Sequence, residues 1–147
     1  MNKNLPDKWI RKAISAAIND IAVDNILIPC YDYRVTSDVN SDTPQHYIVM
    51  TSQTNSVDTS MKCAWNWESS ILLDIVTTYP AHGNTGSRLL ADDILDAVNN
   101  KLTGLVLDQA SGLEIITQIP NFPNDIATST NMEVIFRKFM RIEFYIT

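Results

Sequence analysis

Cysteine and histidine are scarce in this sequence, which contains only two of each among 147 residues. Cys30 and Cys63 do not form a CxxC motif, and neither histidine stands at a zinc-ligand spacing from them. The sequence therefore offers no zinc site. We expect both cysteines to be reduced and mostly buried, because free cysteine is among the most buried residue types. Spacing alone does not decide between free thiols and a disulfide.

Long apolar runs are also missing. No stretch approaches about 18 apolar residues, and no apolar run of the signal-peptide type follows the N-terminus. We therefore expect synthesis in the cytosol and no membrane span. The balance of charge is acidic, with a formal net charge of −6. An acidic chain gains little from counterion release on phosphates, so general nucleic-acid binding is disfavoured.

A glycine-containing turn at residues 83–87 (GNTGS) precedes a predicted helix, a geometry that can hold a phosphate. The turn lacks the lysine of a P-loop and the GxGxxG order of a dinucleotide site. We interpret it as a strand-to-helix turn in which Asn84, Thr85 or Ser87 caps the helix.

Carboxylates and histidines elsewhere form no recognisable catalytic pattern. Asp92, Asp93 and Asp96 are close in sequence, but Asp92 and Asp96 share the helix face opposite the apolar one, which predicts a solvated face. His46 and His82 both lie beside turns without an acidic partner at a recognised offset. We predict no catalytic, cofactor-binding or metal-binding residue, and no cofactor.

Hydrophobic periodicity predicts one α+β domain over residues 1–147. Apolar residues recur at helical spacing in residues 5–23 and again from Leu90 to Leu102, before Gly104. Alternating or β-rich segments predict five strands, at residues 26–35, 46–53, 62–79, 113–119 and 132–147. Residues 36–44 are predicted as a turn-rich loop, and the polar residues 54–60 as a loop or a protruding hairpin tip. The order α-β-β-β-α-β-β predicts a mostly antiparallel sheet with two helices on one face.

The last segment has the clearest pattern, with apolar residues at alternate positions interrupted only by Lys138. This period of two predicts a long antiparallel strand with one face in the core. The other sheet face then carries charged and aromatic side chains, and such a half-apolar face favours oligomerisation. The residues predicted to contact a neighbouring subunit are Val57, Trp65, Trp67, Arg137, Phe139, Arg141 and Tyr145.

The order of elements resembles the tail-terminator and neck proteins of tailed phages. The stretches that carry the resemblance are residues 28–32 (IPCYD), 45–49 (QHYIV), 70–77 (SILLDIVT), 91–98 (ADDILDAV) and 139–144 (FMRIEF). The resemblance covers most of the chain, rests on pattern and order, and includes no catalytic motif.

The resemblance implies a structural protein of the virion, located at the head–tail junction or in the tail, and not an enzyme. Such proteins form a ring, here expected to hold six or twelve copies, that links the portal connector to the tail. DNA passes through the centre without specific binding, and an acidic lumen lets it slide. Two alternatives stay open. One is an adaptor that binds a partner by sheet-edge pairing, and the other is a small hydrolase using the 83–87 turn or the acidic helix.

Overall fold

The structure is a computed structural model, which describes residues 4–32, 45–60, 66–81, 87–130 and 133–147. Within these residues, two α-helices, one 3-10 turn and eight strands make up an α+β fold, as predicted. The elements are α1 (Asp7–Ile18), β1 (Ile21–Val23), β2 (Ile26–Ile28), β3 (Cys30–Tyr31), β4 (Gln45–Asp58), β5 (Asn66–Pro80), α2 (Leu89–Leu102), η1 (Gln109–Ser111), β6 (Ile115–Asn121), β7 (Ile126–Ser129) and β8 (Glu133–Ile146).

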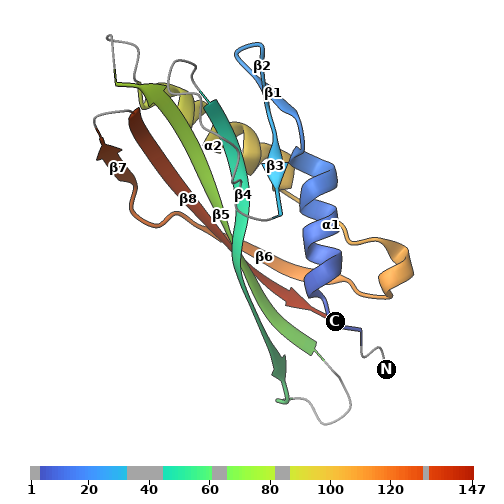
Figure 1. The fold of residues 1–147 in the computed structure, drawn as a ribbon. Helices are drawn as coiled ribbons and strands as arrows, with labels where there is room; N and C mark the ends of the chain where they lie inside the picture. Colours follow the sequence, from blue (N-terminus) through green and yellow to red (C-terminus); the bar gives the residue numbers. More distant parts are fainter. Residues whose placement is uncertain (1–3, 33–44, 61–65, 82–86, 131–132) are drawn as a thin grey trace.

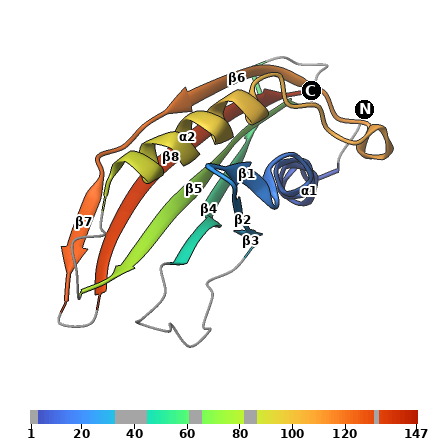
Figure 2. The same cartoon turned by 90° about the horizontal axis from the view of Figure 1, so that it is seen from above.

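The main sheet has the strand order β3-β4-β5-β8-β6, and β7 also pairs with β8. All of its pairs are antiparallel except β3 with β4. β5 and β8 form the centre, in continuous register from Trp67 opposite Ile146 to Pro80 opposite Glu133. β1 and β2 form a separate hairpin. Both helices lie on the same side of the main sheet (Figures 1 and 2).

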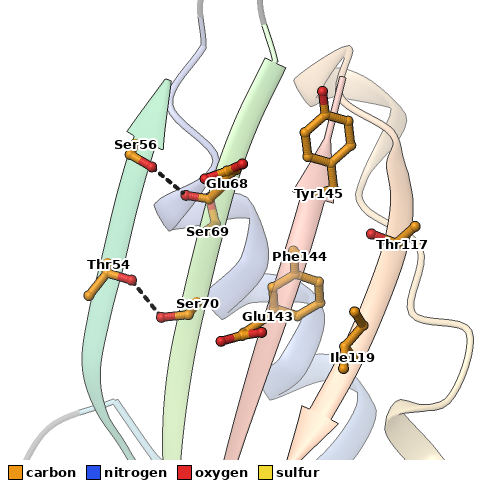
Figure 3. A pocket seen from close by; sticks show the side chains of 10 residues that line it. All are labelled: Thr54, Ser56, Glu68, Ser69, Ser70, Thr117, Ile119, Glu143, Phe144 and Tyr145. Carbon is orange, nitrogen blue, oxygen red and sulfur yellow. Dashed lines mark hydrogen bonds between the residues drawn. The ribbon is translucent and has the colours of Figure 1, made fainter. Parts of the chain in front are cut away.

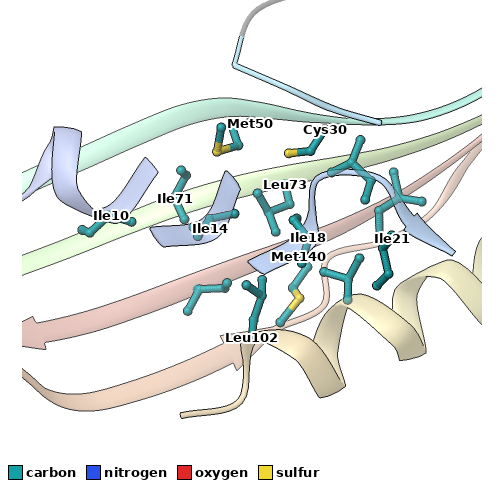
Figure 4. Packing of buried hydrophobic residues seen from close by; sticks show 14 of the residues in the cluster. Ile10, Ile14, Ile18, Ile21, Cys30, Met50, Ile71, Leu73, Leu102 and Met140 are labelled. Atoms are coloured by element: carbon teal, nitrogen blue, oxygen red, sulfur yellow. The ribbon is translucent and has the colours of Figure 1, made fainter. Parts of the chain in front are cut away.

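The hydrophobic core lies between the two helices and this side of the sheet. Its helix residues follow the predicted apolar stripes, because Ile10, Ile14 and Ile18 of α1 are fully buried. They pack with alternate residues of the central strands (Figure 4). The predicted alternation in the last segment is confirmed, since the buried side chains of β8 are Met140, Ile142, Phe144 and Ile146.

The first helix is shorter than predicted. It ends at Ile18, and residues 21–28 form the β1–β2 hairpin instead. Asp24 and Asn25 join the two strands with φ values of 50° and 63°. A two-residue hairpin loop of this type requires positive φ at both positions, which aspartate and asparagine tolerate better than other non-glycine residues. This turn pulls the chain out of the helical path.

Residues 54–60 are predicted as a loop or as a protruding hairpin tip, and the structure has most of the stretch in the β4–β5 hairpin and not in a loop. β4 continues to Asp58, which pairs with Asn66 of β5. Side-chain hydrogen bonds reinforce the ladder, with 2.5 Å between the hydroxyls of Thr54 and Ser70. Polar side chains on both faces hide the period of two that predicts a strand. A second strand missed by the pattern is β7, which pairs with β8.

Neither α-helix in the described part of the chain has the length and apolar content needed to cross a lipid bilayer. The second predicted loop, residues 36–44, lies outside the described residues.

Candidate assembly surface

The sheet has one face that neither helix covers, and we call it the open face. Its central side chains come from alternate residues of β8, whose intervening residues are buried in the core. Register places them beside β5, with Asp74 opposite Phe139, Ser70 opposite Glu143 and Glu68 opposite Tyr145. The β8 members of the open face are Arg137, Phe139, Arg141, Glu143 and Tyr145.

An ion pair stands at the centre of the open face. Nε of Arg137 lies 3.3 Å and 3.2 Å from the two carboxylate oxygens of Asp74, and Nη2 also binds Oδ2. Only 5% of the Asp74 side chain is exposed, against 41% of the Arg137 side chain. Hydrogen bonding to Asp74 raises the pKa of Arg137. The guanidinium also lies 5.3 Å from the ring centroid of Phe139, so one arginine joins a buried charge to an aromatic surface.

A second polar network connects the C-terminal ends of β4 and β8 with the N-terminal end of β5. The hydroxyl of Tyr145 on β8 donates to Oδ2 of Asp58 on β4 at 2.6 Å. The Tyr145 hydroxyl oxygen in turn accepts a hydrogen bond of 2.9 Å from the side-chain amide of Asn66 on β5. The hydrogen bond from Tyr145 lowers the pKa of Asp58, and the bond to Asp58 raises the pKa of Tyr145. The β4–β5 hairpin is thereby held against the C-terminal end of β8.

Between these features the open face is hollowed into a groove of about 460 Å³, which we call the open-face groove. β4, β5, β8 and β6 all contribute side chains to it (Figure 3). Hydroxyl groups cover much of the wall, including those of Thr54, Ser70 and Tyr145. The carboxylates of Glu68 and Glu143 give the groove its negative charge, and Ile119 supplies an apolar side. The described lining contains no histidine, cysteine or lysine.

The predicted subunit-contact residues divide between the two sides of the sheet. Arg137, Phe139, Arg141 and Tyr145 lie together on the open face, as their alternation predicts.

Trp67, another predicted subunit-contact residue, lies on the core side of the sheet and not on the open face. Its side chain is 6% exposed and belongs to the core. Trp67 is separated from Ile71 and Leu73 by even numbers of residues, so it points to the same side as they do. Val57, which pairs with Trp67, is half-buried against that core. Trp65 lies outside the described residues.

The other candidate sites have simpler roles. Residues 82–86, with His82, lie outside the described chain. The N-cap of α2 is Arg88 and not one of the three predicted residues, although Oγ of Ser87 accepts a hydrogen bond of 3.1 Å from the Leu89 N–H. Burial lowers the pKa of His46, whose ring packs 5.2 Å from that of Tyr79. The buried Cys30 thiol has its pKa raised to about 11, by desolvation first and by Asp32 second.

The acidic helix is not simply solvated, which corrects the sequence-based interpretation. Asp92 forms an ion pair with Lys138, the residue that interrupts the apolar row of β8. Lys138 also lies 3.1 Å from Asp125. Hydrogen bonding to Asp92 is the main cause that raises the pKa of Lys138. Partial desolvation, followed by repulsion from Asp24, raises the pKa of Asp93. The ion pair of Asp92 with Lys138 therefore connects α2 to β8 of the main sheet.

Three carboxylates of the open face were not among the predicted subunit-contact residues. Asp74 is the single charged residue in the apolar stretch from Ile71 to Val76, which is a usable signal. The alternation of the last segment predicts the face of Glu143, but Glu68 carries no comparable signal, and only the register places the two glutamates in one groove.

No protein-family model matches the chain, and no curated protein is similar to it in sequence. Among solved structures, it is similar to a chain from the virion of a native gene transfer agent particle. The TM-score is 0.48 and the identity is 14%, over 79% of this chain and 78% of the other.

Proposed function

We propose that this chain is a structural protein of a phage-like virion that forms a ring of the tail-terminator type. The ring stands at the head–tail junction or at the top of the tail, and the chain is not an enzyme. The proposal joins the resemblance of the sequence to tail-terminator and neck proteins with the properties of the open face.

The observation that carries the proposal is the uncovered sheet. Both described helices lie on one side, which leaves the central strands β5 and β8 with a face that no described element covers. This face holds an aromatic ring at Phe139 and two arginines, residue types that are enriched in protein interfaces. A partner that covered the face would shield these groups from water.

The length of the strands also suits a subunit that reaches its neighbours. β4 and β5 extend well past the N-terminal end of α1 and form a projecting hairpin (Figure 1). The Tyr145–Asp58–Asn66 network holds this hairpin against β8. A projecting arm fixed at its base presents a surface in a set direction, which repeated contacts around a ring require.

A net charge of −6 fits a channel that DNA crosses without being bound. Negative surface repels phosphates, so a ring of such subunits does not hold the DNA in place. The expected partners are therefore other copies of the chain and the portal, connector or tail proteins that adjoin the ring.

An adaptor that binds by edge pairing is the second candidate, and one observation favours it. β3 pairs with β4 only at Ile48 and Val49, so among the described residues the distal edge of β4 from Thr51 to Asp58 has no partner strand on that side. Such an edge is a site for strand addition.

Copy number per particle tests the proposal. Quantitative mass spectrometry of purified particles, against labelled peptides of this chain, is expected to give six or twelve copies per particle. Hundreds of copies would indicate a capsid or tail-tube component, and absence from the particle would refute a virion role. Purified protein assayed against esters, phosphate esters and peptides is expected to show no turnover. An activity that is lost in His82→Ala or Ser87→Ala would overturn the non-enzyme part.

A further inference from the structure

The exposed side of α1 carries the charge opposite to that of the open-face groove. Lys8, Arg11 and Lys12 are exposed there, and we call them the basic stripe. Arg11 faces Asp32 at 3.8 Å, but within the described chain neither lysine has a carboxylate within 4.0 Å. Both ammonium groups lie over the Trp9 ring, at 4.5 Å and 5.1 Å from its centroid. The Trp9 indole therefore holds the ammonium groups of Lys8 and Lys12 close together on the helix surface.

The open-face groove carries negative charges that complement the basic stripe. Glu68 and Glu143 are both exposed, and no described lysine or arginine forms an ion pair with either. Apolar groups accompany the charge on both surfaces. Leu5, just before α1, is 60% exposed, and Ile119 beside the groove is 54% exposed. Each surface therefore combines an apolar group with charges, and the charges are of opposite sign.

These two surfaces cannot meet within one copy. Ile10, Ile14 and Ile18 attach α1 to the core side of the sheet, and the basic stripe lines a hollow on that same side, together with Met50 of β4. The groove opens on the other side, with α1 behind the sheet in Figure 3. Complementary surfaces on opposite sides of a subunit make a head-to-tail contact, which closes into a ring when the rotation allows.

We infer that the open-face groove of one copy receives the basic stripe of a second copy, a contact that rests on the ring proposed above. Lys8 and Lys12 pair with Glu68 and Glu143 of the neighbour, and Leu5 packs near Ile119. Arg141, which donates a 3.0 Å hydrogen bond to Ser70 of the groove wall, stands at the edge of the contact. It repels the arginine of the incoming stripe and so favours the register that centres the two lysines.

Charge reversal and mixing test the contact. The groove variant is Glu68→Lys with Glu143→Lys, and the stripe variant is Lys8→Glu with Lys12→Glu. In a sample of either variant alone, the groove and the stripe carry charges of the same sign. Each variant is therefore expected to self-associate at least about tenfold more weakly than the parent protein. Mixed in equal amounts, the two variants restore both sets of opposite charges. Native mass spectrometry is then expected to show oligomers with equal numbers of each, when one variant carries a mass tag.

The chain offers matched controls with the same changes of charge. Glu114→Lys and Lys101→Glu alter exposed residues outside the two surfaces and are expected to leave association unchanged. A protein with all four reversals is expected to associate as the parent does. Thermal unfolding of every variant shows whether the fold is intact, and the mixing result does not depend on small losses of stability.

Two results would overturn the inference, and they bear differently on the ring. If the parent associates and both reversed variants associate equally well, the ring uses other surfaces. If the parent stays monomeric at millimolar concentration, the groove and stripe do not form a contact by themselves. In either case six or twelve copies on the particle would still support the ring, so the two proposals fail separately.

Discussion

Arg137 on β8 holds the buried carboxylate of Asp74 on β5, and the two residues are 63 positions apart in the sequence. The carboxylate is almost fully covered, whereas the guanidinium stays partly in water. The pair therefore neutralises a charge within the sheet and presents a cation on its surface.

Replacing Arg137 by methionine is expected to destabilise the fold. The change leaves the Asp74 carboxylate covered and without its cation. Breaking a fully buried pair costs roughly 3–5 kcal/mol, and the exposure of Arg137 reduces the expected loss to about 2 kcal/mol. Urea unfolding measures the loss. Arg141→Met is the matched control, because Arg141 contacts only the hydroxyls of Ser70 and Ser52 in the described chain. Equal losses in both variants would show that the ion pair has no special role.

Ile142→Asp is expected to unfold the domain. Ile142 is fully buried in the strand at the centre of the sheet. An unpaired carboxylate there costs several kcal/mol, which is comparable to a total stability of roughly 5–15 kcal/mol. Circular dichroism and solubility measure the effect. The neighbouring change Glu143→Gln alters an exposed residue and is expected to leave the melting curve in place. A soluble Ile142→Asp protein with the parent's melting curve would contradict the assigned core.

The link between α2 and β8 is expected to depend on pH. The pKa of Lys138 is raised above 10.5 by Asp92 first. The stabilisation of the fold by the Lys138 ion pair is therefore complete below the unfolded-state pKa of Lys138. It is lost as the pH rises through the higher folded-state pKa. Asp92→Asn is expected to lower the free energy of unfolding at pH 7 by less than about 1 kcal/mol, because Asp92 is about half exposed.

The difference between Asp92→Asn and the parent is expected to shrink once the pH exceeds the folded-state pKa of Lys138. Denaturant unfolding at a series of pH values measures it. Asp96→Asn is the control, since Asp96 is exposed on the same helix and forms no ion pair among the described residues. If the two asparagine variants behave alike at every pH, the Lys138 pair does not stabilise the fold.

Cys30 is expected to resist thiol reagents in the native protein. Its pKa of about 11 keeps the thiol protonated near pH 8, and its side chain is buried. The thiolate is the reactive form, so reaction with an aromatic disulfide should be at least about a hundredfold slower than in urea. The measurement uses Cys63→Ser protein, so that only Cys30 reports. Equally fast reaction with and without urea would contradict the assigned burial.

Patterns with one dominant period were predictable from the sequence. The alternation from Met140 to Ile146 gave both the strand and its core side, and the spacing of Ile10, Ile14 and Ile18 gave the helix. The prediction failed where two patterns competed. Ile21 continues the helical spacing, so only the Asp24-Asn25 turn signalled the hairpin that replaces the end of the helix.

The open face was predictable only in part. Alternation placed Arg137 and Phe139 on it correctly, but Trp67 was assigned by its aromatic character when its even spacing from Ile71 indicated the core. The groove was not predictable. Glu68 and Glu143 come together through the register of β5 with β8, which is a long-range property that local periodicity does not contain.

Cryo-electron microscopy of the intact particle tests the central claim most directly. The predicted result is a closed ring of six or twelve copies of this chain on the head–tail axis, with the open face of each copy covered by a neighbour. The ring proposal is contradicted if the chain is absent from that axis or is present only as scattered single copies.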